Sequence, residues 1–431
     1  MDTIKKYYND NDIVLINASE IIEVVLCALS KIDPRLINHG ERVGYIATMI
    51  CKECKDRSDF DFSKLLVLCI LHDIGAYKTN EIDDMLRFET ETFFDHSLYG
   101  YLFLKNTSHL SEYAEALLYH HTDYSSAVMR NSRFANYAQI IHLADRADIL
   151  MHSGKTDISI FRSLAGSQFN PDYVDALFSA EEKYNLSQKI ATEGYKPEFN
   201  ELIKLVEIKS SEIMEYLMLL VYAIDFRSPY TVTHTADTTI ISLETGKLLG
   251  LSEHDLQALY IGAFLHDIGK IAIPHSVLEK PGKLTPDEFE IIKKHIHEGE
   301  QILRGVVSDE ICDIALRHHE KLDGSGYSKG LAADQLTLPQ RILAVADIFS
   351  ALSQRRSYKE PFSKEKVVSI LTGMKNMGLL CPLVIDTVCA NYELILGNTE
   401  RSHDPVKILY NNLKHEYTER HAELYGVQSV K

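Results

Sequence analysis

Long apolar runs are absent from this chain of 431 residues. The segment that comes closest, residues 216–224, is far shorter than the ~20 residues that cross a bilayer. Residues 1–12 lack the basic start and apolar core of a signal peptide. The seven cysteines are scattered, and the pair Cys51 and Cys54 has no second CxxC pair to complete a metal site. We therefore expect a cytoplasmic protein that is not anchored in a membrane and whose cysteines are reduced thiols.

Positive charge is also in short supply, because the formal net charge is −17. Nucleic-acid polymers and anionic membranes bind surfaces rich in Lys and Arg, so this balance argues against both as partners. A small phosphorylated ligand is still compatible with the composition, because it needs only a few local cations or bound metal ions.

Strict alternation of apolar and polar residues, the mark of a half-buried strand, does not persist anywhere in the sequence. Apolar residues recur at helical spacing instead, for example in residues 12–30 and 201–222. The predicted fold class is all-α. Because the chain exceeds the usual size of one hydrophobic core, we expect two domains, residues 1–195 and 196–431, connected by one long helix over Glu201–Tyr222.

The two halves of the chain carry the same His and Asp pattern in the same order. The first half contains His39, His72, Asp73, His96, His120, His121 and Asp145. The second half contains His234, His266, Asp267, His295, His318, His319 and Asp347. Each residue of the second set follows its counterpart by 194 to 202 positions. This repeat predicts a tandem duplication of a helical bundle, with these side chains gathered inside each copy.

Imidazole nitrogens and carboxylate oxygens together suit ions such as Fe, Mn, Zn or Ni. Asp347 follows the apolar run 342–346, where a carboxylate would be costly without a partner or a metal ion. Seven candidate ligands are too many for one ion and fit two ions that share a carboxylate, an arrangement that can clamp phosphate oxygens.

Residues 225–400 resemble the HD-GYP family of HD-domain metal phosphohydrolases. The resemblance rests on the segments HDIGK (266–270), LEKPGKL (278–284), HHEKLDGSGY (318–327), RILAVAD (341–347) and RSYK (356–359). It implies hydrolysis of a 3′,3′-cyclic dinucleotide to the linear 5′-phosphorylated dinucleotide, with two divalent ions such as Fe or Mn. The tandem layout is similar to family members that act on 3′,3′-cGAMP, so this substrate is favoured, with c-di-GMP next.

The resemblance also implies roles for individual residues. The seven His and Asp residues of the second half would be the metal ligands, with Asp267 and Lys270 as the catalytic pair. Lys270 would contact the scissile phosphate and assist the leaving oxygen, whereas Arg356 and Lys359 would hold the second phosphate. Gly326 and Tyr327 belong to the loop beside the pocket.

Three positions depart from the family pattern. Ser328 replaces the proline of Gly-Tyr-Pro, which predicts a less rigid loop. Tyr230 stands where members with three metal ions carry a Glu, which favours two ions here. The segment Asp237-Thr238-Thr239 replaces the Arg-Val pair that usually follows the first histidine.

The first half keeps the ligand pattern and lacks the phosphate-binding residues. Ala76 stands at the position of Lys270, and the segment after His121 has no counterpart of residues 323–327. Three interpretations remain: a structural and dimerisation domain with or without metal, a regulatory domain that senses a small ligand, or a phosphomonoesterase that removes the 5′-phosphate from the linear product.

The protein as a whole also has alternatives to the phosphodiesterase. One is a signalling scaffold that binds a cyclic dinucleotide without turnover, and another is a nucleotidase acting on mononucleotides. Candidate protein partners are a second copy of the chain and a cyclase bound through the loop of Gly326 and Tyr327.

Overall fold

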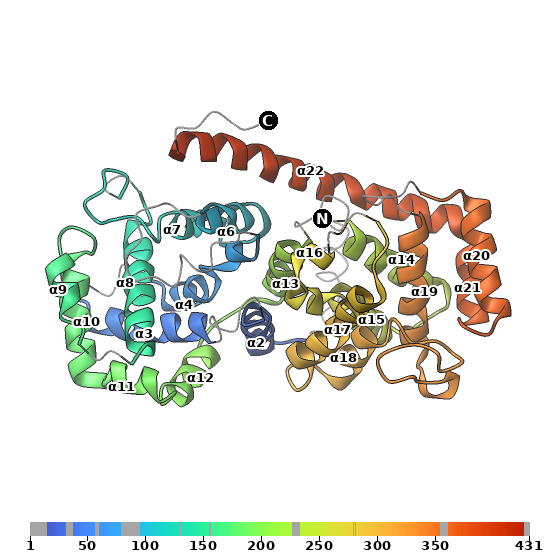
Figure 1. The fold of residues 1–431 in the computed structure, drawn as a ribbon, viewed down its shortest axis with the longest axis horizontal. Helices are drawn as coiled ribbons and strands as arrows, with labels where there is room; N and C mark the ends of the chain where they lie inside the picture. The colour runs from blue at the N-terminus through green and yellow to red at the C-terminus, as the bar shows by residue number, and fades with distance from the viewer. Residues whose placement is uncertain are drawn as a thin grey trace. The chain divides into compact units, whose positions relative to one another are not determined.

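The computed structural model describes residues 15–31, 38–56, 60–78, 95–129, 132–154, 157–225, 233–278, 280, 282–353 and 361–425. Their regular secondary structure consists of α and 3-10 helices, and over these ranges no strand forms beyond three isolated β-bridges (Figure 1). The predicted all-α fold is confirmed. Among the helices so described, none combines the length and apolarity that a membrane span requires.

Backbone contacts divide the chain into two compact units. The N-terminal unit comprises Ile21–Ala223 and Leu413–Lys431, and the C-terminal unit comprises Met1–Glu20 and Ile224–Asn412. Whether residues 1–195 and 196–431 fold as separate domains remains a prediction.

The N-terminal unit is built around α3, which packs on α4, α8 and α10. Its helices are α2 (Ala18–Leu29, of which the first three residues belong to the other unit), α3 (His39–Glu53), α4 (Phe62–Leu71), η2 (Ile74–Lys78), α6 (Asp95–Thr107), η3 (Ser111–Tyr113), α7 (Ala114–Leu118), α8 (Ala135–His152), α9 (Ile160–Leu164), α10 (Pro171–Tyr184), α11 (Leu186–Ala191), α12 (Lys196–Lys204) and α13 (Ser210–Asp225, of which the last two residues belong to the other unit).

The C-terminal unit repeats the same packing around α14, which contacts α15 and α19 as α3 contacts α4 and α8. Its helices are α14 (His234–Leu248), α15 (Glu253–Leu265), η4 (Ile268–Ala272), α16 (His275–Leu278), α17 (Pro286–Leu303), α18 (Asp309–Leu316), η5 (Ala333–Gln335), α19 (Leu338–Ser353), α20 (Lys364–Asn376), α21 (Pro382–Ala390) and the first part of α22 (Tyr392–Tyr425). The sequence repeat therefore corresponds to a repeat of the fold.

The connecting segment differs from the prediction, because two helices stand where the sequence predicts one. α12 ends at Lys204, and α13 begins at Ser210. The carboxylate of Glu212, in the first turn of α13, accepts the Lys209 N–H at 3.0 Å. The break turns Val206 inward and leaves Leu205 71% exposed. The helical spacing of apolar residues did not reveal the break, because Leu205 and Val206 both continue that spacing although only Val206 is buried.

Helix starts in the C-terminal unit follow from local sequence. The Ser252 hydroxyl accepts the Asp255 N–H at the start of α15. At the start of α17, Thr285 and Glu288 form a reciprocal capping box, with Pro286 in the first turn. These caps fix where α15 and α17 begin. His266 directly follows α15, and His295 lies within α17.

Candidate metal centres

The structure brings the seven predicted ligands of the C-terminal unit together from separate elements. His234 begins α14, His266 caps α15, Asp267 precedes η4, His295 lies in α17, His318 and His319 follow α18, and Asp347 lies in α19. All except His234 and His319 are buried. Such a concentration of polar groups in a core requires partners.

Asp267 lies at the centre of this group. Its Oδ2 is 3.2 Å from His266 Nε2 and 3.8 Å from His234 Nε2. Its Oδ1 is 3.6 Å from His295 Nε2 and 4.0 Å from His318 Nε2. The two carboxylate oxygens therefore face two different sets of imidazoles, which is the arrangement of a carboxylate that bridges two ions.

Asp347 makes a second connection across the site. Its Oδ1 is 3.2 Å from His234 Nε2, and its Oδ2 is 3.8 Å from His319 Nδ1. Two groups of side chains present ligand atoms close enough to hold an ion each: His234, His266 and Asp267 in one group, and His295, His318 and His319 in the other.

Backbone carbonyls orient three of these imidazoles. The Nδ1 atoms of His266, His295 and His318 lie 2.6–2.7 Å from the carbonyl oxygens three residues earlier. A proton on Nδ1 leaves the Nε2 lone pair pointing toward Asp267, and such a hydrogen bond is the usual support of a metal-binding histidine. The donor set and its orientation thus fit divalent cations.

Burial and neighbouring charges shift the pKa values of three members of this group in the directions that metal binding needs. The exception is His266, whose pKa burial lowers but Asp267 raises above its usual value. Burial and the adjacent His319 lower the pKa of His318, and burial lowers that of His319 to about 4, so both imidazoles are neutral at pH 7. Burial alone would raise the pKa of Asp267, but His266 and Lys270 hold it well below its usual value. Asp267 is therefore ionised.

Two glycines allow η4 to reach α17 at the site. A Cβ on Gly269 would lie 1.9 Å from the His295 carbonyl oxygen and 2.5 Å from the Gly299 nitrogen. Gly299 lies one turn after His295, and Gly269 approaches α17 at this position. The contact fixes the distance between Asp267 and His295.

The residues predicted to contact substrate are only partly described. The Lys270 ammonium forms a short ion pair with Asp267 Oδ2, and the Tyr327 ring packs on the His319 imidazole with 4.5 Å between ring centroids. Gly326 lies against the backbone of residues 319–321, where a Cβ would not fit. Arg356, Lys359 and Tyr230 lie outside the described residues.

The loop that carries Tyr327 is held by Glu320, which the sequence analysis did not single out. This buried carboxylate accepts the Ser328 hydroxyl at 3.1 Å and the backbone N–H groups of Lys329 and Leu331 at 2.7 and 3.0 Å. Ser328 thus supplies a hydrogen bond where the family has a proline. The less rigid loop remains a prediction.

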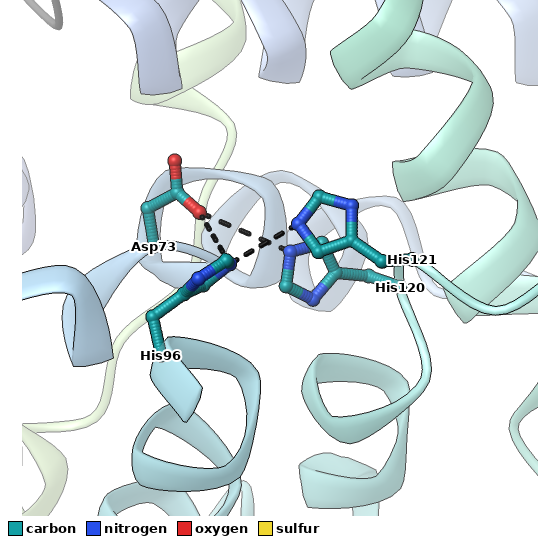
Figure 2. Close-up of side chains that lie close together, drawn as sticks. All are labelled: Asp73, His96, His120 and His121. Carbon is teal, nitrogen blue, oxygen red and sulfur yellow. Dashed lines mark hydrogen bonds and ion pairs between the residues drawn. The ribbon is translucent and has the colours of Figure 1, made fainter. Parts of the chain in front are cut away.

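The N-terminal unit places its seven residues in the same way. Asp73 Oδ2 faces His72 and His39 at 3.3 and 3.6 Å, and its Oδ1 faces His96 and His120 at 3.5 and 3.8 Å. Figure 2 shows Asp73 and His96 turned toward the adjacent pair His120 and His121. Again two groups could hold an ion: Asp73, His96, His120 and His121 in one, and His39, His72 and Asp145 in the other.

Charged neighbours distinguish the N-terminal site. Arg146 donates two hydrogen bonds to Asp145 Oδ2, at 3.0 and 2.7 Å. Asp148 accepts from Arg42 at 2.6 Å and lies 2.7 Å from His39 Nδ1. Burial lowers the pKa of His39, but Asp145 and Asp148 raise it to about 10, so an ion bound there would have to displace a proton.

The C-terminal unit lacks both members of the ion pair between Arg42 and Asp148. By the repeat, Asp237 and Ser350 occupy the positions of Arg42 and Asp148, and His234 Nδ1 lies 3.1 Å from the Ser350 hydroxyl. The departure from Arg-Val after the first histidine therefore accompanies the loss of the carboxylate that the arginine pairs with. Neither position alone indicated that the arginine and the carboxylate are lost together.

The comparisons agree with a duplicated domain. Two family models described as HD domain match residues 36–150 and 219–379. The chain is 30% identical over 403 residues to 3′3′-cGAMP-specific phosphodiesterase 1 of Vibrio cholerae, covering 87% of this chain and 92% of that protein. It is 39% identical over 202 residues to the cyclic di-GMP phosphodiesterase response regulator RpfG of Xanthomonas campestris, covering 46% of this chain and 53% of that protein.

A solved structure shares the fold. The crystal structure of a cyclic GMP-AMP specific phosphodiesterase of V. cholerae (V-cGAP3) superposes with a TM-score of 0.56 at 18% identity, covering 88% of this chain and 98% of that one. With two HD domains in tandem and a relative similar over nearly its whole length, this chain belongs to the HD-domain family, in its HD-GYP branch.

Proposed function

We propose that the C-terminal unit hydrolyses one phosphodiester of a 3′,3′-cyclic dinucleotide to give the linear 5′-phosphorylated dinucleotide. In this proposal the chain is a metal-dependent phosphodiesterase that prefers 3′,3′-cGAMP, followed by c-di-GMP. The observation that carries it is the Asp267 carboxylate, whose two oxygens face two separate histidine groups. The names of the relatives support cyclic dinucleotides as the substrate class.

Seven side chains would hold two divalent ions such as Fe or Mn: His234, His266, Asp267, His295, His318, His319 and Asp347. Ions held there lower the pKa of water and neutralise phosphate charge. The ionised Asp267 and the neutral imidazoles of His318 and His319 are in the protonation states that such binding requires.

The substrate would be held by cations next to this site. Lys270, whose ammonium already pairs with Asp267, would turn to the scissile phosphate and stabilise the leaving 3′-oxygen. Arg356 and Lys359 would bind the second phosphate. Gly326 and Tyr327 would line the entrance, because the Tyr327 ring lies against His319.

For the N-terminal unit we propose removal of the 5′-phosphate from the linear product. Its seven candidate ligands are arranged like those of the C-terminal unit, and Arg146 adds a buried cation beside Asp145. A buried alanine, Ala76, stands where Lys270 stands in the other copy. A site with metal ligands and without that lysine suits a phosphomonoester better than a cyclic diester. A structural or regulatory domain is the alternative outcome.

Two matched variants test both proposals. The purified chain, loaded with Mn or Fe, is offered 3′,3′-cGAMP, c-di-GMP and c-di-AMP, and the products are separated by chromatography. Asp267→Ala should abolish ring opening, whereas Asp73→Ala should open the ring and accumulate the 5′-phosphorylated linear product. An unchanged ring in every case, with metal confirmed bound, would favour the non-catalytic scaffold. Unchanged dephosphorylation in Asp73→Ala would contradict the second role.

A further inference from the structure

Three side chains form a corner beside the second histidine group of the C-terminal unit. Phe289 and Lys293 lie one turn apart on α17, and Tyr327 comes from the loop after His319. The Phe289 and Tyr327 rings meet edge to face, with 6.2 Å between centroids and an interplanar angle of 79°. The Lys293 ammonium lies 4.9 Å from the Phe289 ring centroid and 5.6 Å from that of Tyr327. We call these three residues the aromatic corner.

The aromatic corner is anchored on one side and open on the other. Tyr327 is half-buried, because its ring packs on His319, so this side of the corner adjoins the candidate metal site. Phe289 is 43% exposed, although burying such a ring is strongly favourable. The same helix, α17, carries Phe289 of the aromatic corner and, six residues later, the candidate metal ligand His295.

We infer that the aromatic corner binds one nucleotide of the substrate, with a purine base stacked on Phe289 and the adjoining phosphate attracted by Lys293. The inference rests on the proposed function and adds the residues that recognise the base. Stacking on an aromatic side chain is tolerant of sequence, because every base has a π-face. The corner would therefore strengthen binding of guanine and adenine nucleotides alike.

Position and charge both support this assignment. The substrate carries a base on each side of its scissile phosphate, so a base must lie close to the metal ligands on at least one side. The aromatic corner offers an exposed ring there, and its one formal charge is positive although the chain is acidic overall. Glu290 partly compensates that charge, because its carboxylate accepts from Lys293 Nζ at 2.7 Å.

Substitutions at Phe289 separate stacking from simple apolar burial. We expect Phe289→Ala to weaken binding of a phosphorothioate analogue of 3′,3′-cGAMP, which resists hydrolysis, by about 10-fold, within the range measured for base stacking. Phe289→Leu should weaken it nearly as much, whereas Phe289→Trp should restore it. Lys293→Met should raise the Kd and reduce its dependence on ionic strength. Met377→Ala, which removes an exposed side chain from another part of the same unit, is the matched control and should leave the Kd unchanged.

The outcomes distinguish this inference from the proposed function. If Phe289→Leu binds the analogue as tightly as Phe289→Trp, stacking plays no part and the inference fails. If the wild-type chain binds the analogue but opens no cyclic dinucleotide, the proposed catalysis fails, and the Phe289 series still decides the role of the corner. If the wild-type chain does not bind the analogue at all, both are overturned.

Discussion

Asp267 and Lys270 show how a few side chains can set the chemistry of a site. The ammonium of Lys270 and the imidazole of His266 hold the pKa of Asp267 well below its usual value in spite of burial. Lys270 is 22% exposed as a side chain, so it can also reach a bound phosphate. The N-terminal copy, with Ala76 in this place, keeps the carboxylate and lacks the cation.

We predict that Lys270→Met lowers kcat for ring opening by about 10²- to 10³-fold, the usual effect of removing one group that stabilises a developing negative charge. Metal content, measured on the same samples, should be retained, because the proposed ligands are untouched. A variant that loses both metal and activity would show that Lys270 organises Asp267 rather than assisting the leaving oxygen.

A second prediction concerns Glu320, whose carboxylate accepts three hydrogen bonds from the loop of Tyr327. Glu320→Gln places amide N–H donors opposite backbone N–H donors. We expect a loss of about 1–3 kcal/mol in the free energy of unfolding of the C-terminal unit, measured by denaturant titration. Ser328→Ala, which removes one hydroxyl from an exposed position, should have a smaller effect. Equal effects would mean that the backbone bonds contribute little.

At the scale of elements, the approach of η4 to α17 determines the site. Gly269→Ala would place a methyl group 1.9 Å from the His295 carbonyl oxygen, so α17 must shift. We expect a loss of about 3 kcal/mol or more, together with reduced metal content in the C-terminal unit. Gly373→Ala is the matched control, because a Cβ there meets no atom within 4 Å. It should be neutral or stabilising, because alanine favours the helix. Full metal content in Gly269→Ala would contradict this prediction.

The capping box of α17 gives the same element a dependence on pH. A hydrogen bond from Lys280 and one from the Thr285 N–H lower the pKa of Glu288 in the folded chain. Stability from this group is therefore present above the unfolded pKa of ~4.3 and is lost as the pH falls through the lower folded pKa. We expect Glu288→Gln to lower the melting temperature at pH 7 and to match the wild type at strongly acidic pH. A constant difference at every pH would exclude the carboxylate as the cause.

At the scale of the whole molecule, α22 contributes residues to both units. Its last part packs on α6, the helix that carries His96. Tyr417 stacks on Tyr99 with 4.5 Å between centroids, Glu416 pairs with Lys105, and His421 Nε2 lies 3.5 Å from Asp95. The N-terminal unit is therefore not built from the first half of the sequence alone.

Because the last part of α22 belongs to the N-terminal unit, we predict that Tyr417→Ala destabilises this unit by about 1–2 kcal/mol, through the lost aromatic contact and buried area. Thr418→Ala, on an exposed position of the same helix, should change stability by less than about 0.5 kcal/mol. Stopping the chain at residue 412 should lower metal content at His96 and its neighbours more than in the C-terminal unit. An unaffected N-terminal unit would support residues 1–195 as an independent domain.

Much of this organisation could be predicted from the sequence. The His and Asp repeat indicated the duplicated helical fold, because ligand positions tolerate few other residue types. The break between α12 and α13 was missed, because helical periodicity continued through Leu205 and Val206 while only one of them is buried. The roles of the buried residues Glu320 and Arg146 were missed as well, since the sequence alone does not show which groups a buried charged side chain will contact.

The sequence by itself determined the helical class, the tandem repeat and the residue types offered to a metal ion, because helix periodicity and donor chemistry are local properties of the chain. Only the tertiary structure decided which oxygens of Asp267 and Asp73 face which imidazoles. It also decided that Gly269 meets α17, and that Phe289 and Tyr327 lie together near His319. Distances between segments far apart in the chain are fixed by packing, and packing leaves no periodic signal in the sequence.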